Sequence, residues 1–248
     1  MSKFVWYELM ASDPVAAARF YGDVIGWGAQ AFGADYTQML AGGQAVAGIM
    51  PMPDKAKSMG VRPAWVGYLG VRDINAALDE LRAAGGAIYR PAYHVPSIGW
   101  MAVVADPQGA MFMLIAPEGA GELPNLIDPG HIGWHELYAN DRDAAFEFYS
   151  GLYGWTKAGA VDLGADGIYQ LFATGAHPVG GMMNKPAHFP APHWLYYFNV
   201  DDVVQALVRA VAGGGKMLNG PEEVPDGSII AQALDPQGAV FALVERKK

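Results

Sequence analysis

Two glutamates, each two positions after a tryptophan, are the first candidates for chemistry in this chain. Trp6 and Glu8 recur 128 positions later as Trp134 and Glu136. Residues two apart in a β-strand share a face, so each tryptophan should lie beside its glutamate. A carboxyl group buried among apolar side chains has a raised pKa, which suits a general acid or base near neutral pH. The alternative is that a buried hydroxyl, indole or amide binds each glutamate, which then only fixes its strand.

This repetition extends over most of the chain. Residues 6–27 match residues 134–155 at many positions, and residues 106–114 match residues 235–243. Internal repeats of this length indicate a duplicated fold. Between the two copies the apolar pattern gives way to Gly, Pro, Asn and Asp, which is typical of a connecting segment. The predicted organisation is a first domain at 1–118, a linker at 119–130 and a second domain at 131–248.

The composition limits the compartment and the partners. Of the 248 residues 52% are hydrophobic, yet no apolar run approaches the ~18–20 residues of a membrane span. The net charge of −9 argues against a general nucleic-acid binder, which needs a basic face. Because there is no cysteine, disulfides, thiolate metal ligands and cysteine nucleophiles are excluded. We expect a cytoplasmic protein that takes a small molecule and has no nucleic-acid or membrane partner.

Each half contains two copies of a strand, helix, strand, strand, strand unit. In the first copy, residues 4–10 alternate like a half-buried strand. Asp13 is placed to cap a helix that begins at Pro14, and Gly26 ends it. Short strands are expected around 36–40 and 45–50. The N-caps expected for the later helices are Asp73, Asp141 and Asp202. The sequence therefore predicts an α+β fold of four βαβββ modules.

These repeated segments resemble the vicinal oxygen chelate superfamily, which includes glyoxalase I, bleomycin-resistance proteins and extradiol dioxygenases. The likeness covers essentially the whole chain. The chain is similar in particular to the tandem glyoxalase-like proteins of bacteria. It implies that modules pair into two domains, each with a curled mixed sheet around a cavity. The residues that carry it are Asp13, Phe20, Tyr21, Gly26, Trp27, their copies Asp141, Phe148, Tyr149, Gly154 and Trp155, and the two Asp-Pro-Gln-Gly-Ala turns.

The resemblance also implies metal ligands on the first and last strands of the modules, and here the sequence departs from the family. The corresponding positions hold Trp6, Val66, Trp134, Leu195, Met113 and Ala242. A hard divalent cation needs several convergent carboxylate or imidazole groups. We therefore predict no metal and no cofactor, and the metal chemistry of the family is not carried over.

The same strand alternation identifies the polar and aromatic side chains that should line each cavity. Tyr68 lies two residues after Val66, and Tyr197 lies two residues after Leu195. His193, two residues before Leu195, could join the side chains of the second half; the first half has Ala64 at the corresponding position. The tryptophans and methionines have a simple alternative as core residues. The predicted catalytic residues are Glu8, Glu136, Tyr68 and Tyr197. The predicted substrate-binding residues are Trp6, Trp134, Met113 and His193.

Three functions remain open. In the first, the chain binds a small hydrophobic or aromatic molecule, and Glu8 or Glu136 moves a proton in a lyase, isomerase or hydrolase reaction. In the second, it sequesters such a molecule without chemistry, as in the bleomycin-resistance branch. In the third, it is a metal-dependent enzyme with displaced ligands, such as His193 with Glu136. Because duplication supplies the pairing that shorter relatives obtain by dimerising, we expect a monomer, with a homodimer as the alternative.

Overall fold

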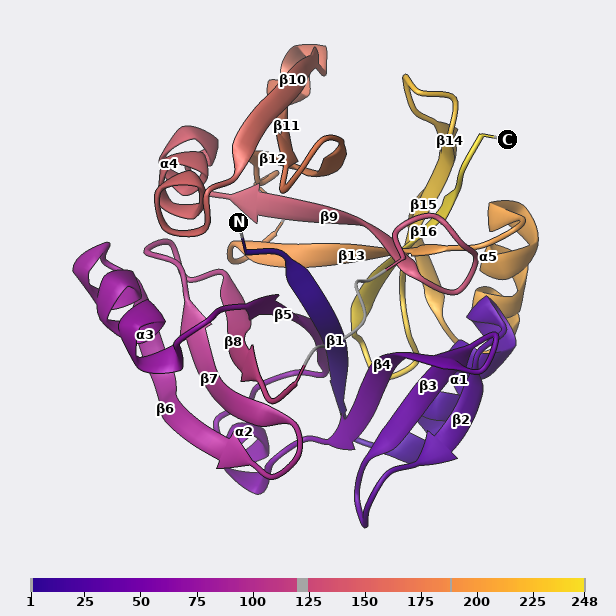
Figure 1. Cartoon of the computed structure of the whole chain (residues 1–248). Helices are drawn as coiled ribbons and strands as arrows, with labels where there is room; N and C mark the ends of the chain where they lie inside the picture. Colours follow the sequence, from indigo (N-terminus) through magenta and orange to yellow (C-terminus); the bar gives the residue numbers. More distant parts are fainter. Residues whose placement is uncertain (1, 120–124, 188, 248) are drawn as a thin grey trace. The chain divides into compact units, whose positions relative to one another are not determined.

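The computed structural model describes residues 2–119, 125–187 and 189–247, and it confirms an α+β fold (Figure 1). The strands are β1 (Phe4–Ala11), β2 (Gly28–Ala31), β3 (Thr37–Ala41), β4 (Gln44–Pro51), β5 (Ala64–Gly70), β6 (Ala87–Val95), β7 (Gly99–Ala105), β8 (Met111–Pro117), β9 (Ile132–Ala139), β10 (Thr156–Asp162), β11 (Ile168–Ala173), β12 (Pro178–Asn184), β13 (His193–Asn199), β14 (Lys216–Glu223), β15 (Ile229–Leu234) and β16 (Val240–Glu245). The helices are α1 (Pro14–Ile25), α2 (Asp54–Ser58), α3 (Ile74–Ala83), α4 (Arg142–Tyr153) and α5 (Val203–Ala212), with a 3-10 turn at Gly164–Asp166.

The strands form two eight-stranded sheets, one from each half of the chain. The first has the order β2-β3-β4-β1-β5-β8-β7-β6, and the second has the equivalent order β10-β11-β12-β9-β13-β16-β15-β14. In every module the first strand runs parallel to the last, as β1 does with β4 and β5 with β8. The strands between them pair antiparallel. This is the fourfold βαβββ pattern that the sequence predicts.

The four long helices begin at the predicted caps. The Asp13 carboxylate accepts a hydrogen bond from the Ala16 amide at 3.0 Å, and Pro14 occupies the first turn of α1. Gly26 ends α1 in the left-handed conformation, with φ of 91°, where a residue without a β-carbon is favoured. Asp73, Asp141 and Asp202 cap α3, α4 and α5 in the same way. Local capping rules therefore suffice to place these helices.

Some elements differ from the sequence prediction. The βαβββ unit includes the strand β2 without giving its residues, and the short helix α2 was not expected. The strand β6 runs from Ala87 to Val95 and includes His94. Pro91 has no N–H and argues against a continuous strand, but β6 is the edge strand of its sheet and its register against β7 shifts on either side of Arg90. Edge strands with bulges tolerate proline.

The chain forms two compact units, each of which combines segments from both halves. Unit 1 consists of Met1–Val5, Gly67–Leu123 and His135–Trp194, and unit 2 consists of Trp6–Val66, Pro124–Trp134 and Leu195–Lys248. Unit 1 thus holds most of the second and third modules, and unit 2 holds most of the first and fourth. The predicted domain boundaries stay a prediction, and residues 120–124 of the predicted linker lie outside the described residues.

A buried tyrosine joins the modules within each unit. In unit 2 the Tyr21 hydroxyl donates to the Asp235 carboxylate at 3.1 Å and accepts from Trp65 Nε1 at 2.9 Å. Asp235 belongs to the fourth module and Tyr21 to the first. Burial raises the pKa of Asp235, although backbone amides also donate to this carboxylate. Unit 1 repeats the arrangement with Tyr149, Asp106 and Trp194.

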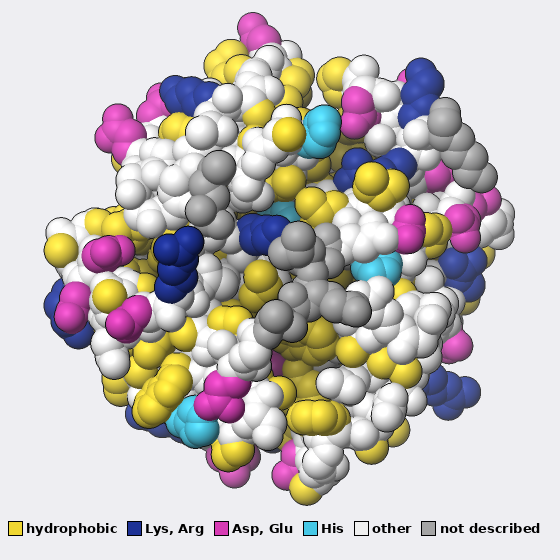
Figure 2. Space-filling model, viewed as in Figure 1, with side chains coloured by type: hydrophobic (Ala, Val, Ile, Leu, Met, Phe, Trp, Pro, Cys, Tyr) yellow, Lys and Arg dark blue, Asp and Glu magenta, His cyan; other side chains and the backbone are white. Residues whose placement is uncertain are grey.

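The surface mixes charged and apolar side chains. On the face shown in Figure 2, acidic and basic side chains are scattered, and hydrophobic ones lie between them. Val15 on α1 is the most exposed of the large apolar side chains among the described residues, at 81%. Among the described helices, none has the length and hydropathy required to cross a membrane.

Candidate functional site

Trp6 and Glu8 lie on the same face of β1, as the alternation predicts. The residues that alternate with them, Tyr7 and Leu9, are buried on the other face. Trp6 and Glu8 themselves are only partly buried. The face that carries them is therefore the one that can meet another molecule.

Tyr36, immediately before β3, connects these two side chains. Trp6 Nε1 donates a hydrogen bond to the Tyr36 hydroxyl oxygen at 2.9 Å. The same hydroxyl forms a side-chain hydrogen bond with Glu8. Because the tyrosine oxygen accepts from the indole, its own hydrogen is the one directed to the carboxylate. Burial, and then the negative charge of Glu8, raise the pKa of Tyr36, so the phenol keeps its proton and remains a donor.

A glycine beside Glu8 leaves room for this tyrosine. Gly48 on β4 is the register partner of Glu8 in the parallel pair. A β-carbon at Gly48 would overlap the hydroxyl and the ring of Tyr36. Glycine is therefore needed here for space, and the hydroxyl of Tyr36 lies next to the Glu8 position because that space is open.

The second half repeats this local arrangement. Glu136 on β9 pairs in register with Gly181 on β12. The ring of Tyr169 fills the volume that a β-carbon at Gly181 would need. Glu136 is 5% exposed and is thus a buried carboxyl group. Each half therefore places a tyrosine over the glycine that is paired with its glutamate.

The sequence prediction missed both tyrosines of these clusters. Tyr36 and Tyr169 lie near the start of the third strand of their modules, and each faces a glycine on the fourth strand. That combination, present in both halves, is the signal that could have identified them. A cross-strand prediction that aligned β3 with β4 would have been needed to use it.

Each of the two predicted tyrosines lies opposite the last strand of its own module. Tyr68, which is buried, pairs in register with Met113, and Val103 is the next partner across the sheet. Tyr197 pairs with Ala242, and its hydroxyl accepts a hydrogen bond from Gln232 Nε2 at 3.0 Å.

The two halves therefore differ at this place. Gln232 and Val103 are both partners of the last strand, opposite Ala242 and Met113. The second half has an amide there and the first half has an aliphatic side chain. A polar ligand group would thus meet different surroundings in the two halves.

His193, at the start of β13, contacts two aromatic rings in unit 1. Its ring centroid lies 5.2 Å from that of Tyr138 and 4.8 Å from that of Phe189. Burial lowers the pKa of His193, and the charge of Lys185 lowers it further, against a hydrogen bond to the Ala191 carbonyl. His193 is therefore a neutral imidazole near neutral pH.

His135, the residue before Glu136 on β9, lies on the opposite face of the strand from Glu136. It is 2% exposed, its ring stacks on Phe4 with centroids 4.6 Å apart, and its Nδ1 lies 2.7 Å from the Val179 carbonyl oxygen. These contacts make it a core residue. Trp134, one position earlier, is partly exposed like Trp6.

The donor set of the described residues does not fit the metal that the family resemblance implies. Within residues 2–119, 125–187 and 189–247, no three His, Asp or Glu side chains come together as a metal site would require. Of the strand positions where ligands would be expected, Met113 pairs in register with Tyr68 and Ala242 pairs with Tyr197. A thioether and a methyl group are poor ligands for a hard cation. The side chains at these strand positions are thus better suited to contact an organic molecule than to coordinate an ion.

Comparison with known proteins supports the fold and the duplication. The model of the Glyoxalase/Bleomycin resistance protein/Dioxygenase superfamily matches residues 3–114 and 130–243, once in each half. CFP32 of Mycobacterium tuberculosis, whose name assigns it provisionally to the glyoxylases, is 32% identical over 245 residues, covering 97% of this chain and 93% of that protein. The anthracycline biosynthesis protein DnrV of Streptomyces peucetius is 31% identical over 262 residues, covering 98% and 93%.

Solved structures share the architecture at low sequence identity. The Mn(II)-bound glyoxalase from Novosphingobium aromaticivorans superposes with a TM-score of 0.67 at 17% identity, covering 100% of this chain and 84% of that one. Homoprotocatechuate 2,3-dioxygenase from Arthrobacter globiformis gives a TM-score of 0.71 at 14% identity, covering 98% and 79%. At these identities the likeness shows the fold alone.

Proposed function

Since this chain belongs to the glyoxalase/bleomycin resistance protein/dioxygenase superfamily, we propose that it binds a small aromatic or hydrophobic organic molecule on the sheet faces that carry Trp6 and Trp134. The observation that carries the proposal is the state of Trp6. Trp6 is partly exposed and its indole N–H is already bonded to Tyr36, so the rest of the indole that a ligand can meet is apolar. Such a ring is suited to stacking against another ring.

The relatives support the same ligand class. DnrV is named for anthracycline biosynthesis, and anthracyclines are fused-ring aromatic compounds. A ligand of that kind would match an indole wall whose hydrogen-bonding edge is satisfied. The proposal for this chain is the general class, a ring-bearing organic molecule, and not an anthracycline in particular.

Proton transfer is a second candidate function, and the Tyr36–Glu8 hydrogen bond favours it. A carboxylate that already accepts from a phenol is held in one orientation, as a general base must be. The buried Glu136 stands in the same place in the second half. Glu8→Gln and Glu136→Gln keep the shape of the side chain and replace the ionisable carboxyl group with a neutral amide. If the protein catalyses proton transfer, the double variant should retain ligand binding and lose turnover.

Calorimetric titration with 1-naphthol tests the binding function. We expect saturable binding, and we expect the double variant Trp6→Ala/Trp134→Ala to bind at least about tenfold more weakly, equivalent to about 1.4 kcal/mol. Trp100→Ala is the matched control, because Trp100 is a half-exposed tryptophan on β7 outside the proposed site. Recovery of the ligand after long incubation distinguishes the two candidates: unchanged ligand indicates binding alone, and a product indicates catalysis.

A further inference from the structure

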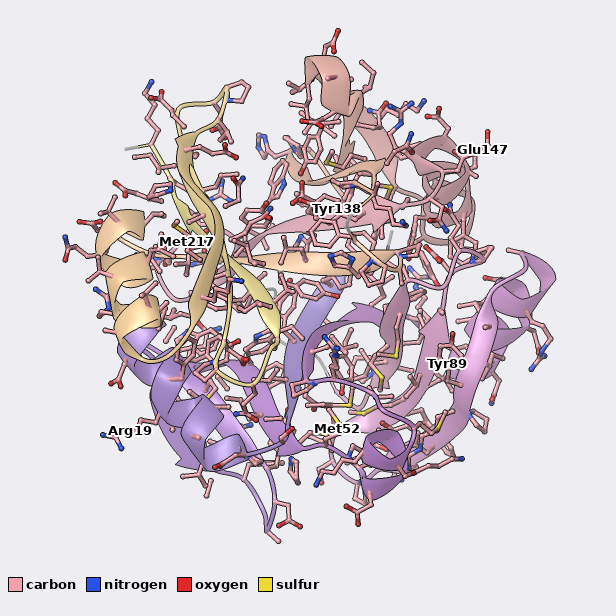
Figure 3. The ribbon with its side chains drawn as sticks, turned by 180° about the vertical axis from the view of Figure 1, so that it is seen from behind. Arg19, Met52, Tyr89, Tyr138, Glu147 and Met217 are labelled. Carbon is pink, nitrogen blue, oxygen red and sulfur yellow. The ribbon has the colours of Figure 1, made fainter. Side chains whose placement is uncertain are left out.

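Three rings of unit 1 form a cluster, the aromatic triad, made of Tyr138, Phe189 and His193. Tyr138, labelled in Figure 3, lies near the end of β9, on the same strand as Glu136 and two residues away. Its ring centroid is 4.9 Å from that of Phe189 and 5.2 Å from that of His193, and the Phe189 and His193 centroids are 4.8 Å apart. All three rings are therefore in mutual contact.

The imidazole in this triad has one nitrogen without a partner. His193 Nδ1 lies 3.1 Å from the Ala191 carbonyl oxygen. A carbonyl oxygen can only accept, so Nδ1 carries the hydrogen and Nε2 of the neutral ring carries the lone pair. Nε2 is buried and has no hydrogen-bond partner within the described part of the chain. A buried acceptor without a donor is unfavourable and is normally satisfied by a ligand or by water.

Phe189, unlike the other two members of the triad, comes from a connecting segment. Phe189 lies between β12 and β13, outside regular secondary structure. Lys185 holds the segment by donating from Nζ to the Phe189 carbonyl oxygen at 3.0 Å. Phe189 is the member of the triad that lies outside a strand, so its side chain can be displaced with the least disturbance of the sheet.

The described residues of the first half do not repeat the triad. The positions that correspond to Tyr138 and His193 hold Met10 and Ala64. The first half builds the same sheet without these rings, so the fold does not require them. A feature that is present in one copy of a duplicated fold and absent from the other is a candidate for a role in recognition.

We propose that the aromatic triad is a binding site for a planar ring that carries a hydroxyl donor. The ring of the ligand takes the place of the Phe189 side chain beside Tyr138, and its hydroxyl donates to His193 Nε2. This inference rests on the proposed function of the chain, and it adds both the ligand class, a phenol-type hydroxyl on an aromatic ring, and the half of the chain that selects it.

The test compares phenol with toluene, two rings of similar size of which only phenol can donate. Titrations followed by NMR use the wild type and Phe189→Ala, which vacates the ring position. In Phe189→Ala we expect phenol to bind at least about tenfold more tightly than toluene, because toluene leaves the imidazole acceptor unpaired. Adding His193→Phe should bring this ratio to about one while toluene affinity changes little. His177→Phe, at an exposed histidine of the same unit, should leave the ratio unchanged.

Equal affinities of Phe189→Ala for phenol and toluene would overturn the inference, as would a preference for phenol that survives His193→Phe. Absence of phenol binding to Phe189→Ala would also overturn it. In each case, continued binding of 1-naphthol to the wild type would leave the proposed function standing. If 1-naphthol also fails to bind, the proposed function is refuted together with this inference.

Discussion

Replacing Tyr21 by phenylalanine should weaken unit 2 by removing one hydroxyl that serves two partners. Tyr21 is fully buried, and its hydroxyl donates to Asp235 and accepts from Trp65 Nε1. A hydrogen bond to a charged group contributes about 1.5–3 kcal/mol and a neutral one about 0.5–1.5 kcal/mol. Asp235 keeps hydrogen bonds from the Gln237 and Ala239 amides, so the buried carboxyl group still has hydrogen-bond donors in the variant. We therefore expect a loss of about 2–3 kcal/mol in the free energy of unfolding.

Urea unfolding followed by tryptophan fluorescence measures this loss. Tyr89→Phe is the control, because Tyr89 is 62% exposed on β6 and its hydroxyl should contribute less than about 0.5 kcal/mol. Tyr149→Phe is the matched change in unit 1, since Tyr149 binds Asp106 and Trp194 in the same way. The assignment of a linking role to Tyr21 would be refuted if its substitution cost no more than that of Tyr89.

The remaining predictions concern the pH dependence of stability and the effect of adding a β-carbon at glycines. Burial raises the pKa of Asp235 above 3.8 in the folded chain, so the contribution of this carboxyl group to stability is present below pH 3.8 and is lost as the pH rises through the folded pKa. Asp235→Asn should therefore be more destabilising at pH 4 than at pH 7 in urea titrations. A larger loss at pH 7 than at pH 4 would contradict this. Gly48→Ala and Gly181→Ala should each cost about 1–3 kcal/mol by displacing a tyrosine, whereas Gly151→Ala on α4, where a β-carbon meets nothing, should be neutral or stabilising in thermal unfolding. His193 should titrate below 6.5 by NMR, and because the unfolded chain then binds the extra proton, stability should fall as the pH drops below 6.5; a midpoint above that value would count against a buried neutral imidazole.

The parts of the fold that depend on local rules were predictable from the sequence. Each long helix begins after an aspartate cap, as Asp13 and Asp73 illustrate, because capping involves residues only two or three positions apart. The shared face of Trp6 and Glu8 follows from the two-residue period of a strand. The duplication then extended these local predictions to the whole chain.

The contacts that complete the candidate site were not predictable in the same way. Tyr36 reaches Trp6 across 30 positions, and it does so only because Gly48 leaves a space in the neighbouring strand. The partnership of Phe189 with His193 depends on the path of a connecting segment, for which the sequence has no periodic signal. The predicted roles of the glutamates and tyrosines, and the expected absence of a metal, stay predictions.

The most direct test of the central claim, that the indoles of Trp6 and Trp134 form ring-binding surfaces, is a calorimetric titration of the protein with 1-naphthol. We predict saturable binding to the wild type, and affinity reduced at least about tenfold in Trp6→Ala/Trp134→Ala with Trp100→Ala unaffected. Equal affinity of the double variant and the wild type, with both folded, would contradict the claim, as would the lack of any saturable binding to the wild type.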